Sequence, residues 1–284
     1  MIADITVALA TCADVPNLDE DGPALLAALA ARGVAGLPAV WDAEVDWERF
    51  DLVVVRSAWD YAERRDEFLA WAAGLPRVLN PLPVLRWSTD KHYLADLEAA
   101  GVPVVPTLFL EPGEAFEAPA GRFVVKPVFS AGGRASARYE PEEAAAAAAH
   151  VEALHADGRA AMVQPHVDGV ERAGEIALVY LGGRYSHAVR KRVSLRRGTP
   201  DAPELYLEEA VEAVEPSEAD LRVAEAALAA APLQDLLYAR VDLVHDPEPL
   251  VLELELVEPS LYLLHGEGSA DRLAELIARA VASG

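Results

Sequence analysis

Residues 250–261 read LVLELELVEPSL, an apolar run that carries Glu253 and Glu255 in its middle. In a β-strand, alternate side chains point to opposite faces, so the leucines share one face and the two glutamates share the other. Carboxylates two positions apart on a strand lie roughly 7 Å from one another and repel, unless their face meets water or a cation. The pattern leaves two interpretations open, an edge strand with a wet face or a metal site.

The strand signal just before this run places further charged groups beside it. YARVDLV carries Arg240 and Asp242 on one face, and a short turn leads to the glutamate strand, so the two strands are expected to be neighbours. Carboxylate oxygens with no cysteine nearby suit hard ions such as Mg²⁺ or Mn²⁺. Arg240 can neutralise a phosphate or a developing oxyanion. A salt-bridged sheet face is the alternative, and Pro259 leaves the direction of Glu258 open.

Composition and charge narrow the class of protein. The chain has 284 residues, a length that suggests two or three lobes. It is 52% hydrophobic, so these lobes can share a buried core. Cys12 is the only cysteine, which excludes disulfides and cysteine zinc sites. No apolar run is long enough to span a membrane and no basic leader is present, so a cytoplasmic location is expected. The net charge of −23 disfavours nucleic acid and anionic membranes as partners and makes the position of each cation informative.

Strand and helix signals alternate through residues 1–86 and predict a small parallel α/β lobe. The signals are strands ITVALAT (5–11), DLVVVRSAWDY (51–61) and RVLNPLPV (77–84), and helices DGPALLAALAARG (21–33) and RRDEFLAWAAGLP (64–76). Beyond this point antiparallel strands and separate helices are expected, so the fold class is α+β, with further lobes at 87–165 and 166–284.

Local signals define parts of these later lobes. Ser88 or Thr89 is expected to cap a helix that ends at Gly101. VVKP and ASARY predict two strands joined by a glycine-rich loop, and AAMVQPHV predicts a strand that breaks at Pro165. The dipeptide at residues 182–183, Gly-Gly, marks a hairpin turn.

Glycines and lysines outline an anion site. The loop residues are Ser130, Ala131, Gly132 and Gly133. Such a loop would aim backbone amides at an anion, with an ordinary hairpin turn as the alternative. Lys126 lies in an apolar strand, where a lysine is seldom buried without an anionic partner. Lys91 is expected in the first turn of a helix, where the dipole favours a bound anion. Unless these are ordinary surface lysines, they and the carboxylates indicate a magnesium nucleoside triphosphate site.

The segment MVQPHVDGVE completes this outline. A strand that breaks at Gln164 and Pro165 leaves backbone groups free to hydrogen-bond an adenine edge, and Asp168 or Glu171 could reach ribose hydroxyls. A simple exit from strand to loop is the alternative. Neither a Walker P-loop nor a GxGxxG fingerprint is present in the sequence.

In this order the elements resemble the ATP-grasp superfamily, over essentially the whole chain. VVVRSAWDY, NPLPVLRWSTDKHYL, GVPVVPT, VVKPVFSAGG and LELELVEPSL are similar to the branch that contains O-ureido-D-serine cyclo-ligase, which forms D-cycloserine. The resemblance implies that the N-terminal lobe and two α+β lobes enclose an ATP site. One departure is Glu255, where many members have asparagine, and it puts the geometry of a second metal in question. Pro165 also removes one amide donor at the adenine hinge.

The resemblance implies a role for each matching residue. The implied or expected nucleotide contacts are Lys91, Lys126, Ser130, Ala131, Gly132, Gly133, Gln164, His166, Val167 and Asp168. The implied metal ligands are Asp242, Glu253 and Glu255, for two Mg²⁺ (or Mn²⁺) ions. Arg240 would steady the transferring phosphoryl group. In SHAVRKR, alternation puts His187 and Lys191 on one face and Arg190 on the other, and Lys191 is the candidate for the γ-phosphate or the substrate.

Substrate contacts are expected where the strand ending in RSAWDY meets its loop, since an open α/β sheet presents ligand groups there. The candidates are Arg56, Ser57, Trp59, Asp60 and Tyr61. Arg56 could pair with a substrate carboxylate, while the others could shape the pocket. For the two aromatic residues, packing between lobes is the alternative.

The expected reaction is an ATP-dependent carboxylate–nitrogen ligation through an acylphosphate, in the intramolecular form that the branch implies. It needs no protein nucleophile, which agrees with the lack of a Ser–His–Asp or Cys–His signature. The alternatives are a small-molecule kinase, which would release no free phosphate, and a non-catalytic nucleotide-binding protein. The expected partner is a small-molecule carboxylate or amine. A homodimer is expected only because proteins with this fold commonly form one. Substrate identity and stereochemistry are left open.

Overall fold

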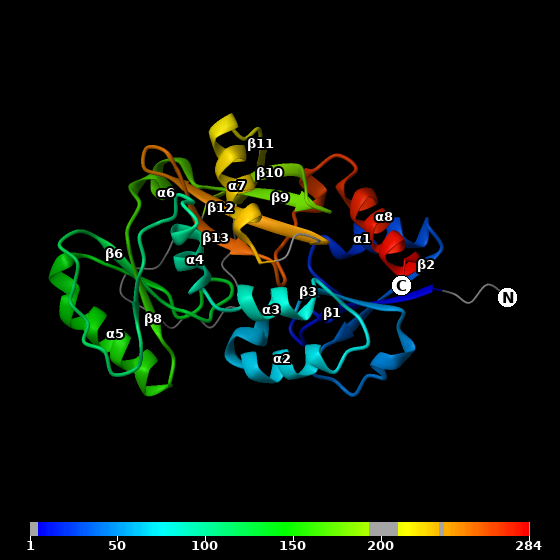
Figure 1. The fold of residues 1–284 in the computed structure, drawn as a ribbon, viewed down its shortest axis with the longest axis horizontal. Helices are drawn as coiled ribbons and strands as arrows, with labels where there is room; N and C mark the ends of the chain where they lie inside the picture. The colour runs from blue at the N-terminus through cyan, green and yellow to red at the C-terminus, as the bar shows by residue number, and fades with distance from the viewer. Residues whose placement is uncertain (1–4, 193–209, 233–235, 284) are drawn as a thin grey trace.

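The computed structural model describes residues 5–192, 210–232 and 236–283. The described strands form three sheets, one in each part of an elongated molecule (Figure 1). Its N-terminal part lies at one end, a small antiparallel sheet with one long helix lies at the other, and the third sheet runs between them. No helix within the described ranges is long and apolar enough to cross a membrane.

The N-terminal sheet is parallel, as predicted, with strand order β2-β1-β3-β4. Its strands are β1 (Ile5–Thr11), β2 (Val34–Val40), β3 (Leu52–Ser57) and β4 (Val78–Leu79). The connecting helices are α1 (Gly22–Ala30), α2 (Arg65–Ala73), η1 (Trp47–Arg49) and η2 (Trp59–Glu63). β3 is buried at every position, as expected of a parallel strand covered on both faces. β2 was not predicted, because Gly36 and Pro38 weaken its strand signal; it lies at the sheet edge, where proline is tolerated.

Two short helices follow β4 in place of the single helix expected there. They are α3 (Leu82–Ser88) and α4 (Tyr93–Ala99). The expectation that Ser88 or Thr89 caps one helix was wrong, because Pro83 lies at the start of α3 and proline favours the first turn of a helix. Ser88 therefore ends α3. Lys91 lies between the two helices, not in the first turn of one.

The sheet at the opposite end from the N-terminal lobe, called the central sheet because it comes second in the sequence, is antiparallel, with strand order β5-β8-β6-β7. Its strands are β5 (Leu108–Leu110), β6 (Phe123–Pro127), β7 (Ala137–Tyr139) and β8 (Ala161–Pro165), with the helices η3 (Pro141–Glu143) and α5 (Ala144–Ala156). α5 packs on this sheet through a core that includes Phe123, Tyr139 and Val151. The structure confirms the two strands around the glycine-rich loop and the strand that ends at Pro165.

The third sheet is also antiparallel, with strand order β11-β10-β9-β12-β13. Its strands are β9 (Glu175–Leu181), β10 (Arg184–Arg192), β11 (Ala210–Val214), β12 (Tyr238–His245) and β13 (Pro249–Glu255). The remaining helices are α6 (Asp168–Ala173), α7 (Glu218–Ala230), η4 (Leu263–His265) and α8 (Ser269–Ala282). The predicted hairpin joins β9 and β10, and β12 pairs with β13 as expected. α4 and α7 cover the apolar face of this sheet, which leaves the opposite face for polar groups.

The N-terminal lobe and the third sheet share a continuous core. Residues of β1, β3, β9 and β12 pack together with α1 and α8, and these two helices lie side by side in Figure 1. Asn80 joins the same parts through hydrogen bonds: its Nδ2 donates to the carbonyl oxygens of Tyr238 (2.9 Å) and Leu256 (2.8 Å), and its Oδ1 accepts from the Leu237 amide (2.8 Å). The lobe boundaries at residues 86 and 165 stay predictions.

Candidate active site

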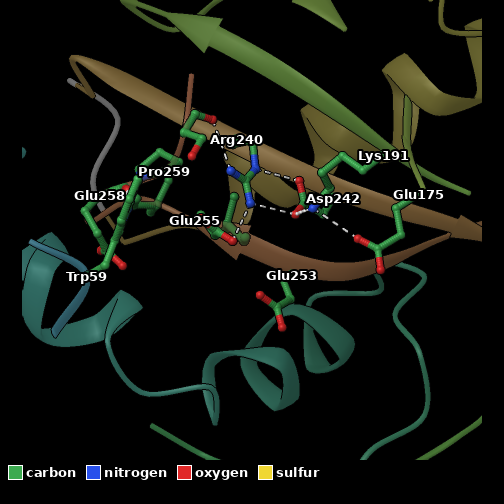
Figure 2. A network of polar contacts seen from close by, with 12 residues as sticks. Trp59, Glu175, Lys191, Arg240, Asp242, Glu253, Glu255, Glu258 and Pro259 are labelled. Carbon is green, nitrogen blue, oxygen red and sulfur yellow. Dashed lines mark hydrogen bonds and ion pairs between the residues drawn. The ribbon is translucent and has the colours of Figure 1, made fainter. Parts of the chain in front are cut away.

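A row of charged side chains lies on the face of β12 and β13 that α7 leaves uncovered. Arg240 pairs in register with Glu255, and Asp242 pairs with Glu253, which confirms that they share one face. Arg240 donates to Asp242 from Nε (2.8 Å to Oδ1) and from Nη2 (3.0 Å to Oδ2), and its Nη2 also donates to Glu255 Oε1 at 2.5 Å (Figure 2). β13 is an edge strand, but the Glu253 and Glu255 side chains are only 22% and 29% exposed. Their face therefore meets cations rather than open water.

The row continues onto β10 and β9. Lys191 lies between Asp242 and Glu175, with its Nζ 2.7 Å from Asp242 Oδ2 and 3.0 Å from Glu175 Oε2 (Figure 2). Gly174 makes this arrangement possible, because its φ is +75° and a Cβ there would come within 2.5 Å of the Lys191 carbonyl oxygen. Glu175 was not among the predicted site residues, although the Gly-Glu dipeptide at residues 174–175 is one of the elements that resemble the ATP-grasp superfamily.

Lys91, between α3 and α4, and Lys126, on β6, approach the row from outside the third sheet. Their ammonium groups lie 3.8 Å and 3.7 Å from Glu253 Oε1. Lys91 also donates to the carbonyl oxygen of Ser130 (2.8 Å) and lies 3.1 Å from its hydroxyl, which ties the glycine-rich loop to the site. Together with Lys191 these are all the lysines of the chain, and every one is buried. The other basic residues among the 24 are arginines, and sequence reasoning did not use the fact that every lysine falls in a candidate site position.

These ion pairs decide which carboxylates carry charge. Burial alone would raise the pKa of Asp242, but Arg240 and Lys191 outweigh it and lower that pKa to about 2. Burial likewise opposes ionisation of Glu253, yet the nearby lysines lower its pKa. For Glu255 the balance is reversed, because burial together with the charges of Asp242 and Glu253 raises its pKa to about 7 despite Arg240. Glu255 therefore holds a proton more readily than the two carboxylates beside it.

A cavity of about 440 Å³ lies next to the row, between the central and third sheets. Its lining residues include Val105, Val124, Lys126, Gln164, His166, Val167, Glu171, Glu175, Val244 and Leu252. Apolar side chains and a small number of polar groups thus line the cavity together, as in most small-molecule sites. The His166 amide donates to the Arg122 carbonyl oxygen (2.8 Å), and the Gln164 side chain donates to Thr107 Oγ1 (2.9 Å). Asp168 is not part of the lining and pairs with Arg122 at 2.5 Å.

The glycine-rich loop reaches from the central sheet to the N-terminal lobe. Gly132 and Gly133 adopt positive φ angles of 62° and 68°, a backbone that other residues rarely adopt. Beyond them Arg134 forms an ion pair with Glu63, and Ala131 packs against the core of the N-terminal lobe. The loop is therefore anchored to the N-terminal lobe on both sides of the exposed Gly132 and Gly133.

A segment after β13, residues 257–261, is held by side chains from four elements. Its carbonyl contacts are Val257 O with Tyr238 Oη (2.8 Å), Glu258 O with Trp59 Nε1 (3.1 Å), Pro259 O with Arg56 Nη1 (3.3 Å), Ser260 O with Arg240 Nη1 (3.0 Å) and Leu261 O with His187 Nε2 (2.9 Å). Sequence reasoning gave no sign of these contacts, because the side chains that make them lie far away in the chain.

The predicted substrate residues divide into two groups. Arg56 and Trp59 reach the 257–261 segment, and Arg56 is also 3.6 Å from Asp19. The others find partners inside the N-terminal lobe: Ser57 lies 3.3 Å from Thr11, Asp60 accepts from Trp41 (2.8 Å) and Arg64 (2.9 Å), and Tyr61 packs in the aromatic core. Of the five candidates, the structure thus brings Arg56 and Trp59 to the 257–261 segment through backbone carbonyls. Tyr61 also lies near the site, because burial and the charges of Glu258 and Glu255 raise the pKa of its hydroxyl.

The donor chemistry of the row fits a divalent cation. Asp242, Glu253 and Glu255 offer carboxylate oxygens, which are the ligands that Mg²⁺ prefers. Among the described residues no three acidic or histidine side chains converge on one point, because arginine and lysine groups hold the carboxylates as ion pairs. A cation arriving with anionic phosphates would give both the carboxylates and the basic groups new partners.

Comparison with known proteins establishes the family. A family model described as the N-terminal domain of D-cycloserine synthetase DcsG matches residues 7–80. The cycloserine biosynthesis protein DcsG of Streptomyces lavendulae is 41% identical over 294 residues, which cover 96% of this chain and 97% of that protein. The chain belongs to the DcsG family.

Solved structures agree with this assignment. A crystal structure of D-cycloserine synthetase DcsG matches with a TM-score of 0.87 at 38% identity and covers 97% of this chain and 99% of its own. D-alanine–D-alanine ligase from Bacillus anthracis complexed with ATP matches with a TM-score of 0.68 at 14% identity, over 98% of both chains, and shows the shared fold. The ATP-grasp fold expected from the sequence is confirmed. As a member of a synthetase family, the chain is an ATP-dependent ligase.

Proposed function

We propose that this protein is an ATP-dependent cyclo-ligase that converts O-ureido-D-serine towards D-cycloserine. The observation that carries the proposal is the gathering of every lysine of a DcsG-family chain around Glu175, Asp242 and Glu253, beside a cavity of about 440 Å³. A strongly acidic protein that places all its lysines there is equipped to hold a polyphosphate.

The cavity is assigned to the nucleoside of ATP. Val124 and Leu252 provide apolar surface for a flat base, and Gln164 lines the same cavity. Because the His166 amide is taken by Arg122, the hinge amide we assign to adenine is that of Val167. For the ribose, Glu171 is better placed than Asp168, since Glu171 lines the cavity.

The triphosphate is assigned to the cationic side of the row. Lys91 and Lys126 would contact the α- and β-phosphates, and the loop at residues 130–133 would cover them. Asp242, Glu253 and Glu255 would hold Mg²⁺ or Mn²⁺, which neutralises charge on the transferring phosphoryl group. Arg240 and Lys191 are assigned to the γ-phosphate and to the oxyanion formed from the substrate carboxylate.

The chemistry needs two steps at one site. A substrate carboxylate oxygen takes the γ-phosphoryl group, which gives an acylphosphate and ADP. The ureido nitrogen next to oxygen then attacks the acyl carbon; the new C–N bond closes the ring, and the C–O bond to phosphate breaks. Formation of cycloserine further requires hydrolytic loss of the carbamoyl group as carbon dioxide and ammonia. Because nucleophile and carboxylate belong to one molecule, orientation supplies much of the rate.

Incubation of the purified protein with Mg-ATP and each enantiomer of O-ureido-serine tests the proposal. We expect phosphate release with the D enantiomer, together with a ring product lighter by one water or with cycloserine after loss of the carbamoyl group. A phosphorylated product without free phosphate would establish a kinase instead. No turnover with either enantiomer would overturn this substrate assignment.

The small-molecule partner, the location and the oligomeric state remain part of the proposal. Its partner is a small-molecule amino acid derivative, which agrees with the biosynthetic role in the names of its relatives. A cytoplasmic location and a homodimer are carried forward as predictions. Light scattering of the purified protein measures its oligomeric state.

A further inference from the structure

Glu258 is a buried residue whose carboxyl group has no hydrogen-bond or ion-pair partner among the residues that the structure describes. The residue is 7% exposed. Burial of a carboxyl group without compensating bonds is unfavourable, so such groups in native proteins call for an explanation. The other acidic groups of the row, in contrast, each have a cationic neighbour within 4 Å.

The backbone around Glu258 is held while its side chain is not. Trp59 donates to the Glu258 carbonyl oxygen, Arg56 to that of Pro259 and Arg240 to that of Ser260. These donors come from the N-terminal lobe and from β12, so the residue is clamped from both sides. Nothing in this arrangement satisfies the carboxyl group itself. The geometry is that of a side chain positioned for a group that comes from outside the protein.

The carboxyl group lies between the charged row and the N-terminal lobe. Its charged neighbours are led by Glu255, Lys91 and Arg240. On the other side, Glu258 is the charge that most affects the Tyr61 hydroxyl. Figure 2 shows Glu258 beside Trp59 and Pro259, at the end of the row nearest Glu255. A substrate whose carboxylate meets Arg240, and which folds back on itself to close the ring, would therefore hold its attacking nitrogen between Arg240 and Glu258.

We propose that Glu258 binds the N–H group of the attacking nitrogen and accepts its proton as the ring closes. This inference rests on the proposed function. In the step, the nitrogen lone pair forms the C–N bond, phosphate leaves with the electrons of the C–O bond, and the N–H proton passes to the Glu258 carboxylate. A carboxylate suits this task because it only accepts hydrogen bonds, whereas the lysines and Arg240 only donate them.

The surroundings also favour a proton acceptor. Burial and the neighbouring charge of Glu255 raise the pKa of Glu258. A carboxylate with raised proton affinity is a stronger base than an exposed glutamate. A general base is most effective when its pKa lies near the operating pH. The lysines nearby are committed to Glu253 or Asp242, so they leave this position to Glu258.

The test separates activation of the carboxylate from closure of the ring. Wild type and E258Q are incubated with Mg-ATP and O-ureido-D-serine, with and without hydroxylamine, which captures an acylphosphate as a hydroxamate without a protein base. We expect E258Q to form ADP and hydroxamate within a few-fold of wild type, while ring formation falls about 10²- to 10⁴-fold, the usual range for a general base. E258D should restore part of the ring-forming rate.

Controls distinguish this role from a structural one and from failure of the proposed function. E248Q, on the exposed turn between β12 and β13, should leave both steps unchanged. E258Q should melt at the temperature of wild type or above it, because it removes an uncompensated buried acid. Ring closure by E258Q at the wild-type rate, or equal loss of hydroxamate and ring, would overturn the inference. If wild type itself forms neither hydroxamate nor ring, the proposed substrate has failed rather than the role of Glu258.

Discussion

Arg240 and Asp242, two residues apart on β12, form a two-point ion pair with distances of 2.8 Å and 3.0 Å. The same guanidinium also donates to Glu255 and to the carbonyl oxygen of Ser260. One side chain thereby links the carboxylate row to the segment that carries Glu258. A planar fork of donors is required for this, which lysine does not offer.

Replacement of Asp242 should damage both folding and turnover. D242N leaves Lys191 and Arg240 buried without their shared anion, and we expect a loss of about 3–5 kcal/mol in the free energy of unfolding. Urea denaturation at neutral pH measures it. The matched variant D271N breaks an exposed pair with Arg32 and should cost less than about 1 kcal/mol. Equal stability of D242N and D271N would show that the row does not contribute to stability as an ion-pair network.

Replacement of Lys126 should weaken binding of phosphates and spare binding of the base. We expect K126M to bind ADP about 10- to 100-fold more weakly than wild type, in line with loss of a charged hydrogen bond, while its affinity for adenosine stays unchanged. Calorimetry with the two ligands measures the difference. An equal loss of affinity for both would mean that Lys126 acts on the shape of the cavity rather than on phosphate.

Replacement of Asn80 should loosen the contact between the N-terminal lobe and the third sheet. N80A leaves the Leu237 amide and the carbonyl oxygens of Tyr238 and Leu256 without their partner, and we expect a loss of about 2–4 kcal/mol in unfolding free energy. S283A removes an exposed hydrogen bond and serves as the control. A melting temperature of N80A within one degree or so of S283A would contradict this account of how the lobes are joined.

His187 should make stability depend on pH. Burial lowers the pKa of His187, so the unfolded chain binds this proton more readily than the folded one. Its contribution is therefore complete above about pH 6.5 and is lost as the pH falls below that value. H187Q should reduce the difference in unfolding free energy between about pH 7.5 and about pH 5.5, two values on either side of the pKa of histidine in the unfolded chain.

The matched control for His187 is H155Q. His155 on α5 also contacts a backbone carbonyl, that of Leu110 at 3.1 Å, and it lies in the central lobe away from the 257–261 segment. If the two variants reduce the pH dependence equally, the effect does not belong to the buried histidine that holds Leu261.

Alternating patterns explain why much of the candidate site was predictable. Glu253 and Glu255 share a face because side chains alternate along a strand, and the short turn before β13 brings that face beside Arg240 and Asp242. The glycine-rich loop and the strand ending at Pro165 were predictable for a different local reason: glycine allows backbone angles that other residues avoid, and proline fixes its own φ and removes an amide donor.

Contacts between distant segments explain what was not predictable. Asn80 binds residues 157 and more positions away, and the donors that hold the 257–261 segment come from β3, η2, β10 and β12. No local pattern marks such contacts, because they arise only when the lobes pack. The misplacement of Lys91 has a different cause: the effect of Pro83 as a helix start was not taken into account.

Transfer of oxygen from substrate to phosphate tests the central claim most directly. O-ureido-D-serine labelled with ¹⁸O in its carboxylate is incubated with the protein and Mg-ATP, and the released phosphate is analysed by mass spectrometry. An acylphosphate formed on this row of carboxylates and cations requires that one labelled oxygen leaves with the phosphate. Release of unlabelled phosphate together with ring product would contradict activation of the carboxylate by ATP at this site.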